Sequence, residues 1–214
     1  MSKLPPMQEQ FRPLGPSFPE AFEPFTLNSA PPLAPAARHG DWMQTATGKA
    51  FWPLDPRPEE IHIEDIAAAL SKLCRYGGHT RKFYSVAEHC VLMAHAAPDG
   101  FRLSALLHDA SEAYLSDVIR PIKAHLANYK TIEAELERAI ARRFTLQFPM
   151  PAEVKALDEA IIADERDQAM LPAPQAWSQW KPVPPLGVTL QFWTPEKAEF
   201  EFLAAFRRYG GHWC

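Results

Sequence analysis

Apolar residues recur every three or four positions along much of this 214-residue chain, and this spacing limits the fold to packed helices. Ile63, Ile66 and Leu70 fall on one helical face, and Leu136 and Ile140 repeat the pattern further along. Nearly half of the residues (47%) are hydrophobic, which is enough to fill the core of one domain. The sequence therefore predicts an all-α domain whose core spans residues 60–170 approximately.

Residues with known positional preferences predict where the helices begin and end. Ser85-Val86-Ala87-Glu88 forms a capping box, in which the serine hydroxyl accepts from the Glu88 N–H and the glutamate reaches back. Gly77-Gly78 ends the helix before it, and a further helix is expected over residues 102–114. Other expected features are a helix after Pro151, a helix from Thr194-Pro195 to Gly210-Gly211, a short hairpin within 40–60 and a strand at 188–192.

Prolines divide the chain into an arm and a domain. Of the 22 prolines, 12 lie in residues 1–60, which predicts an irregular arm over residues 1–40 that is either disordered or docked through its phenylalanines. Residues 41–214 are expected to form a single helical domain, with residues 171–214 as a C-terminal extension.

Bulk composition narrows the expected partners and compartment. The net charge is −4, the pI is about 6.1, and no long basic run occurs, so we expect neither a nucleic-acid polymer nor a membrane as partner. The three cysteines form no CxxC pair, and no signal peptide or membrane-spanning segment is recognisable. These features favour a cytoplasmic protein.

The pair His108-Asp109 lies within the apolar run SALLHDASEAYL, where neither residue suits a core. Burying both side chains without partners would cost roughly several kcal/mol, and a metal ion bound by both would remove that cost. His89 upstream and Asp158 downstream complete a set of two imidazoles and two carboxylates. Asp158 is preferred to Asp164 because three of its four helical neighbours are apolar, which predicts a buried carboxylate.

Such a site would bind one divalent transition metal, and Mn, Co, Fe, Ni or Zn would all fit. The ion would activate a water molecule to attack a phosphate ester or anhydride, so hydrolysis is favoured over redox chemistry. Glu112 lies four residues beyond His108, on the same helical face. We expect it to act as a general acid/base, or else to accept from a histidine N–H.

With those residues placed, the chain resembles the HD-domain metal-dependent phosphohydrolases. The likeness runs from residue 61 to about residue 170 and rests on the ordered H…HD…D pattern within IEDIAAALSKLCRYGGHT, FYSVAEH and HDASEAYLSDVIRPIK. Small 5′-deoxynucleotidases, and phage relatives that hydrolyse deoxynucleoside triphosphates, are the most similar members. The resemblance implies an HD-domain helical bundle and a small-molecule nucleotide substrate.

The resemblance also implies roles for further residues. Arg75 matches an arginine that contacts the substrate phosphate, and Asp117 matches an aspartate near the sugar that is associated with 2′-deoxy preference. Without the resemblance, Arg75 could simply cap a helix C-terminus and Asp117 could be a turn residue. His79 is a weaker candidate for substrate binding, as are three other cations that flank the site: Lys82, Arg120 and Lys123.

The sequence thus predicts a metal-dependent phosphohydrolase of (deoxy)nucleotides, either a monophosphate 5′-nucleotidase or a dNTP triphosphohydrolase. The alternative is a non-catalytic, metal-stabilised module that binds nucleotides or has a regulatory role. Assembly into a homo-oligomer is an expectation that comes from the family resemblance only.

Overall fold

The computed structural model describes residues 37–177 and 183–212, so the first 36 residues of the arm predicted over residues 1–40 lie outside the described residues. Residues 37–214 form one compact unit. Arg38 already belongs to this unit, because its guanidinium pairs with Glu60 at 2.7 Å and with Asp55 at 2.9 Å. The compact unit therefore begins before residue 41, where the domain was expected to start.

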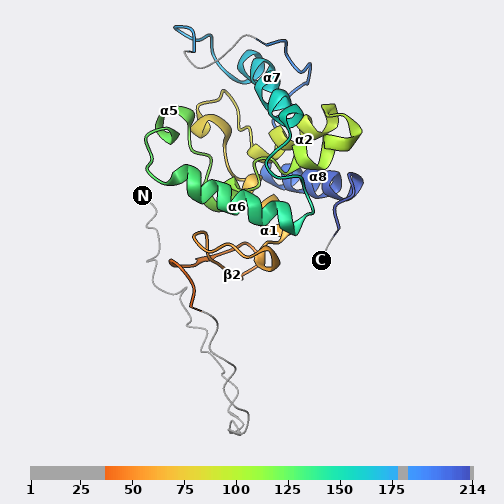
Figure 1. The fold of residues 1–214 in the computed structure, drawn as a ribbon. Coiled ribbons are helices and arrows are strands. Elements are labelled where there is room, and N and C mark those ends of the chain that lie inside the picture. Colours follow the sequence, from red (N-terminus) through yellow and green to blue (C-terminus); the bar gives the residue numbers. More distant parts are fainter. Residues whose placement is uncertain (1–36, 178–182, 213–214) are drawn as a thin grey trace, which may run out of the picture. The chain divides into compact units, whose positions relative to one another are not determined.

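The described residues are mostly helical, as expected of an all-α chain (Figure 1). Their longer helices are α1 (Ile63–Leu70), α2 (Val86–Ala96), α6 (Tyr129–Arg143), α7 (Ala152–Ala169) and α8 (Pro195–Arg208). The short ones are α3 (Arg102–Leu106), α4 (Glu112–Leu115) and α5 (Arg120–Lys123), with 3₁₀ turns at Pro58–Glu60, Arg75–Gly78 and Asp99–Phe101. The strands β1 (Met43–Gln44) and β2 (Ala50–Phe51) form the expected short antiparallel hairpin.

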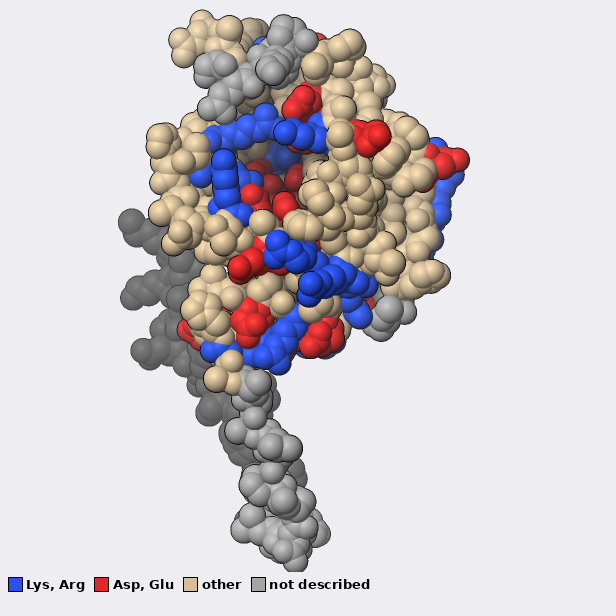
Figure 2. Space-filling view, in the orientation of Figure 1, with Lys and Arg blue, Asp and Glu red and all other residues tan. Residues whose placement is uncertain are grey.

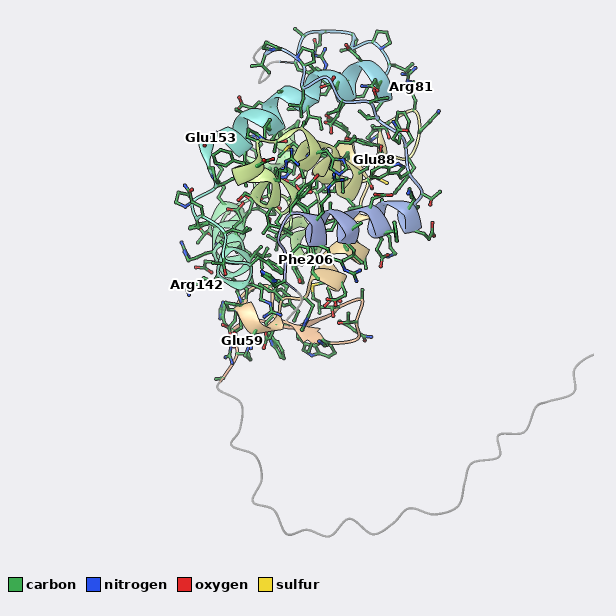
Figure 3. All side chains as sticks on the ribbon, turned by 90° about the vertical axis from the view of Figure 1, so that its right-hand side faces the viewer. Glu59, Arg81, Glu88, Arg142, Glu153 and Phe206 are labelled. Atoms are coloured by element: carbon green, nitrogen blue, oxygen red, sulfur yellow. The ribbon has the colours of Figure 1, made fainter. Side chains whose placement is uncertain are left out.

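Helix α8 packs one face against α1, α2 and α3. Its Phe202 and Phe206 are fully buried, and Phe206 meets the ring of Phe144 edge-on at 5.5 Å between centroids. Both views place α7 at one end of the unit and the hairpin at the other (Figures 1 and 3). Among the described helices, none has the length and apolar character needed to cross a lipid bilayer.

The capping predictions are confirmed at two helix starts. The Ser85 hydroxyl accepts from the Glu88 N–H at 3.1 Å, and the Thr194 hydroxyl accepts from the Lys197 N–H at 3.4 Å. The other half of the capping box is wrong, because the Glu88 carboxylate accepts from three backbone N–H groups of residues 191–193 at 2.7–2.9 Å. Three N–H donors satisfy the hydrogen-bonding capacity of a buried carboxylate better than the single N–H of the capping box would.

Two further predictions of secondary structure are wrong. Residues 188–192 pair with no strand among the described residues, and Phe192 has a left-handed backbone (φ 55°). Side chains hold this segment instead: Gln168 bonds Val188 and Leu190, and Glu88 bonds the residues that follow. The single helix expected over 102–114 is divided into α3 and α4, with His108 and Asp109 in the turns between them. The His108 ring nitrogen Nδ1 lies 2.8 Å from the Ala105 carbonyl, which in a continuous α-helix would accept from the Asp109 N–H.

Candidate metal centre

Three segments that are far apart in the sequence bring the predicted ligands together. His89 lies in the first turn of α2, His108 and Asp109 lie between α3 and α4, and Asp158 lies on α7. Figure 2 shows a hollow on this face of the molecule, between the positions of α5 and α7 in Figure 1, with acidic side chains on its floor and Lys or Arg side chains around its rim. The anion-lined floor would attract a cation, and the basic rim would attract an anionic substrate.

The spacing of the four side chains suits a single ion. The Nε2 atoms of His89 and His108 are 3.2 Å apart. Asp109 Oδ2 lies 3.2 Å from Nε2 of His108 and 3.6 Å from Nε2 of His89, and Asp158 Oδ1 lies 3.9 and 3.5 Å from the same two atoms. Ligand atoms bound at about 2.1 Å from one ion lie about 3–3.5 Å apart. The cluster is thus close to the size that a first-row divalent metal requires.

The hydrogen bonds of the two imidazoles orient their free nitrogens toward the cluster. Nδ1 of His89 lies 2.6 Å from a carboxylate oxygen of Glu165, and Nδ1 of His108 lies 2.8 Å from the Ala105 carbonyl. Since both partners are acceptors, each Nδ1 donates to its partner, and each Nε2 is left facing the cluster, where it could offer a lone pair to a metal ion. Two lone pairs and two carboxylate oxygens then converge, and only a shared positive charge can satisfy them.

The pKa shifts of His108 and Asp109 also indicate that this site favours a positive charge. Burial by itself would lower the pKa of His108, but the charge of Asp109 outweighs burial and holds that pKa well above its usual range. Burial would raise the pKa of Asp109, and the positive charges of His108, His89 and Arg75 lower it instead. A divalent cation could take the place of the proton on His108 and satisfy all four acceptors.

Glu165 was missed in the sequence, although it holds the centre together. It is fully buried, and its carboxylate accepts from Nδ1 of His89 and from the Tyr84 hydroxyl at 2.9 Å, while its other oxygen accepts from the Tyr76 hydroxyl. Burial would raise its pKa, but Arg75 and His89 lower it. A carboxylate behind a metal-ligating histidine fixes the ring and raises its basicity. The available signal was spacing, because Glu165 follows Asp158 by seven residues, two turns of the same helical face.

Arg75 is at the edge of the cluster. Its guanidinium lies 3.3 Å from Asp109 Oδ2 and 3.4 Å from Glu165 Oε2, and the side chain is mostly buried. It begins the 3₁₀ turn Arg75–Gly78, well beyond the end of α1, so it does not cap that helix. Tyr76 beside it has a left-handed backbone (φ 56°), which a tyrosine adopts only where its surroundings enforce it.

The charges of Asp109 and Arg75 shift the pKa values of Glu112 and Asp117, so both carboxyl groups lie near the cluster. Glu112 is buried, and its Oε2 atom has no hydrogen-bond partner among the residues that the structure describes. Burial raises the pKa of Glu112 well above its usual value, and the charges of Asp109 and Asp117 raise it further. Burial also raises the pKa of Asp117, which Arg75 partly offsets. Burial and these two negative charges thus favour the protonated form of Glu112, which could donate to a bound ligand.

Of the four weaker candidates for substrate binding, one contacts the cluster and three have their contacts elsewhere. Arg120 reaches Asp158 Oδ2 at 3.6 Å and so lies at the cluster. Lys123 pairs with Glu133, and Lys82 lies over the ring of Phe192 at 5.1 Å, so each has a partner elsewhere. His79 is exposed and lines a separate pocket, and within the described part of the chain no ion pair joins it to the cluster.

Two neighbours of the cluster are distinct from it. Asp164, not Asp158, is the more buried aspartate of α7, contrary to the sequence argument from apolar neighbours. Its carboxylate accepts from the backbone N–H groups of Leu186 and Gly187 at 2.8–3.2 Å. Cys90 Sγ lies 3.9 Å from Nδ1 of His108, on the protonated side of that ring, and burial raises its pKa to about 11. The thiol could form an alternative group with His108 and Asp109, but it stays protonated at neutral pH.

Comparison with known proteins gives relatives without an assigned activity. No family model matches the chain. It is 40% identical over 144 residues to the uncharacterized protein RCAP_rcc00048 of Rhodobacter capsulatus, an alignment that covers 63% of this chain and 72% of that protein. It is 36% identical over 143 residues to the uncharacterized protein YfdR of Escherichia coli (strain K12), covering 67% of this chain and 80% of that protein. At this identity and coverage, the chain belongs to the same protein family as YfdR.

Proposed function

We propose that this chain is an HD-type, metal-dependent phosphohydrolase that acts on nucleotides. The observation that carries the proposal is the convergence of two imidazole nitrogens and two carboxylate oxygens, in which the nitrogens are 3.2 Å apart and each oxygen lies within 4 Å of both nitrogens. A divalent ion bound there would supply Lewis acidity and an activated water. The resemblance in sequence to HD-domain phosphohydrolases supports phosphate as the group attacked.

The residues around the cluster have properties that suit phosphate hydrolysis. Arg75 presents a guanidinium beside Asp109, where it could bind a phosphate oxygen and offset the negative charge that develops during attack. Burial and the charge of Asp109 raise the pKa of Glu112, so Glu112 would be suited to give a proton to a leaving oxygen. Asp117 would contact the sugar, and Arg120 at the rim could contact a further phosphate.

The test is a substrate panel with the full-length protein. The metal-stripped protein is loaded in turn with Mn²⁺, Co²⁺, Fe²⁺, Ni²⁺ or Zn²⁺ and incubated with deoxy- and ribonucleoside mono- and triphosphates. We expect hydrolysis with at least one metal. Inorganic phosphate and nucleoside from monophosphates would identify a 5′-nucleotidase, and tripolyphosphate or stepwise phosphate loss from dNTPs would identify a triphosphohydrolase.

Variants connect the activity to the cluster. His108→Ala and Asp109→Ala each remove one proposed ligand and should abolish turnover. Asp164→Asn is the matched control, because Asp164 is a buried carboxylate of α7 that bonds backbone N–H groups outside the cluster. Absence of turnover with every metal would refute the proposal and leave a metal-stabilised binding or regulatory module. Turnover that survives His108→Ala would place the chemistry elsewhere.

A further inference from the structure

A pocket of about 570 Å³ is lined by residues other than the proposed metal ligands. Its walls come from the loop at Gly78–Arg81, from Arg166 and Asp167 at the end of α7, and from the segment 170–177. Sites for small organic ligands have volumes of about 300–1,000 Å³ and are mostly apolar, with a few polar groups that orient the ligand. The pocket is therefore large enough for a nucleoside.

Contacts link this pocket to the proposed metal ligands. The ring of Trp177 in the pocket wall lies 6.0 Å from the ring of Tyr76, measured between centroids. The Tyr76 hydroxyl donates to Glu165, and Glu165 accepts from Nδ1 of His89. Two side chains thus separate the pocket wall from the cluster. A ligand with its phosphate at Arg75 could place its organic part in this pocket.

The lining combines apolar surface with hydrogen-bonding groups. Leu171 is 74% exposed, although it is a large apolar side chain, and Ala173 lies in the same wall. Arg81 is fixed by its bond to the Gln168 carbonyl at 2.7 Å, and the Arg166 guanidinium lies 4.9 Å above the Trp177 ring. With two arginines set against Asp167 and an apolar wall, the pocket suits a neutral, flat ring with donors and acceptors better than a polyphosphate.

We propose that this pocket binds the heterocyclic base of the nucleotide and so sets the base preference of the protein. This inference rests on the proposed function for the identity of the ligand. It assigns the phosphate to Arg75 and the cluster, and the base to the surface formed by Leu171, Ala173 and Trp177. Arg81 and Asp167 would supply a donor and an acceptor to the edge of the ring.

The test is binding of free deoxynucleosides, which carry no phosphate and cannot be hydrolysed. The full-length protein is titrated calorimetrically with the deoxynucleosides of adenine, guanine, cytosine and thymine. Ala173→Trp and Ala173→Arg fill the pocket from an exposed position with two chemically different side chains. Ala96→Trp is the control, since Ala96 is an exposed alanine at the end of α2 that does not line the pocket. Thermal unfolding confirms that each variant is folded.

We expect at least one nucleoside to bind, both filling variants to weaken that affinity by about tenfold or more, and the control to stay within about twofold. Unchanged affinity in a folded filling variant would overturn the inference, and so would the failure of every nucleoside to bind. The separate hydrolysis panel keeps the two proposals distinct. A protein that hydrolyses nucleotides but binds no free nucleoside would refute only the pocket. A protein that binds nucleosides, loses that binding in the filling variants and hydrolyses no nucleotide would refute only the proposed catalysis.

Discussion

Replacing Glu165 by glutamine should weaken metal binding while leaving every proposed ligand in place. The amide has the shape of the carboxylate, so its oxygen can keep the bonds to Nδ1 of His89 and to the Tyr84 hydroxyl. Its NH₂ group would then replace Oε2, which lies 3.4 Å from the Arg75 guanidinium. Two hydrogen-bond donors would face each other there. The His89 ring loses an anionic partner and becomes a poorer ligand.

The magnitude follows from the loss of that buried charge. Removing a partner behind a metal-ligating histidine typically lowers metal affinity roughly 10- to 100-fold, which is about 1.4–2.8 kcal/mol. At a metal concentration 100 times the wild-type Kd, the ion stabilises the wild-type fold by about 2.7 kcal/mol. The same concentration should stabilise Glu165→Gln by only about 0.4–1.4 kcal/mol.

The assay is denaturant unfolding of the metal-stripped protein with and without added Mn²⁺ or Zn²⁺, alongside calorimetric titration of the same ions. Asp164→Asn is the control, because Asp164 precedes Glu165 on α7, is also buried, and bonds Leu186 and Gly187 instead of His89. It should lower stability but keep metal affinity within about twofold. Equal metal affinities for Glu165→Gln and wild type would show that the carboxylate does not tune His89, and the argument would fail.

Other predictions concern stability. Burial raises the pKa of Glu137 to about 6, and nearby Glu133 raises it further, so its ionisation disfavours the fold as the pH rises from 4.5 through 6. Glu137→Gln should therefore be more stable relative to wild type at pH 7 than at pH 4.5 in denaturant titrations, and an equal difference at the two pH values would contradict this. Glu88→Gln should lose about 1–3 kcal/mol and speed amide exchange at residues 191–193, because its amide cannot accept from all three N–H groups; unchanged exchange would contradict this. Ser85→Ala should cost about 1 kcal/mol in the same unfolding assay through the lost cap on α2.

The sequence predicted most of the fold where local chemistry decides it. The cap at Ser85, the helix after Pro151 and the helix from Thr194-Pro195 all occur as expected, since each depends on residues next to one another. The division between α3 and α4 could not be predicted, because it depends on where the His108 ring donates its proton. The strand predicted at residues 188–192 is wrong for a similar reason: the distant side chains of Gln168 and Glu88, and not a neighbouring strand, bond the backbone of this region.

The candidate site was predictable to the extent that residue type implies chemistry. His89, His108, Asp109 and Asp158 were chosen because buried imidazoles and carboxylates need a cation, and the structure places both carboxylates within 4 Å of both imidazole Nε2 atoms. The sequence argument could not rank the burial of Asp158 and Asp164, since that depends on where a distant loop at Leu186 and Gly187 docks.

On both α2 and α7, one residue contacts the metal-ligand cluster and the residue before it contacts the segment 186–193. On α2, His89 points into the cluster, and Glu88 before it binds residues 191–193. On α7, Glu165 supports His89, and Asp164 before it binds residues 186 and 187. Each pair is one residue apart, so the two side chains leave the helix in different directions, one toward the proposed metal and one toward the segment. Residues 186–193 are therefore bound at positions next to His89 and Glu165, so a variant at Glu88 or Asp164 can change how that segment docks while every proposed ligand stays in place.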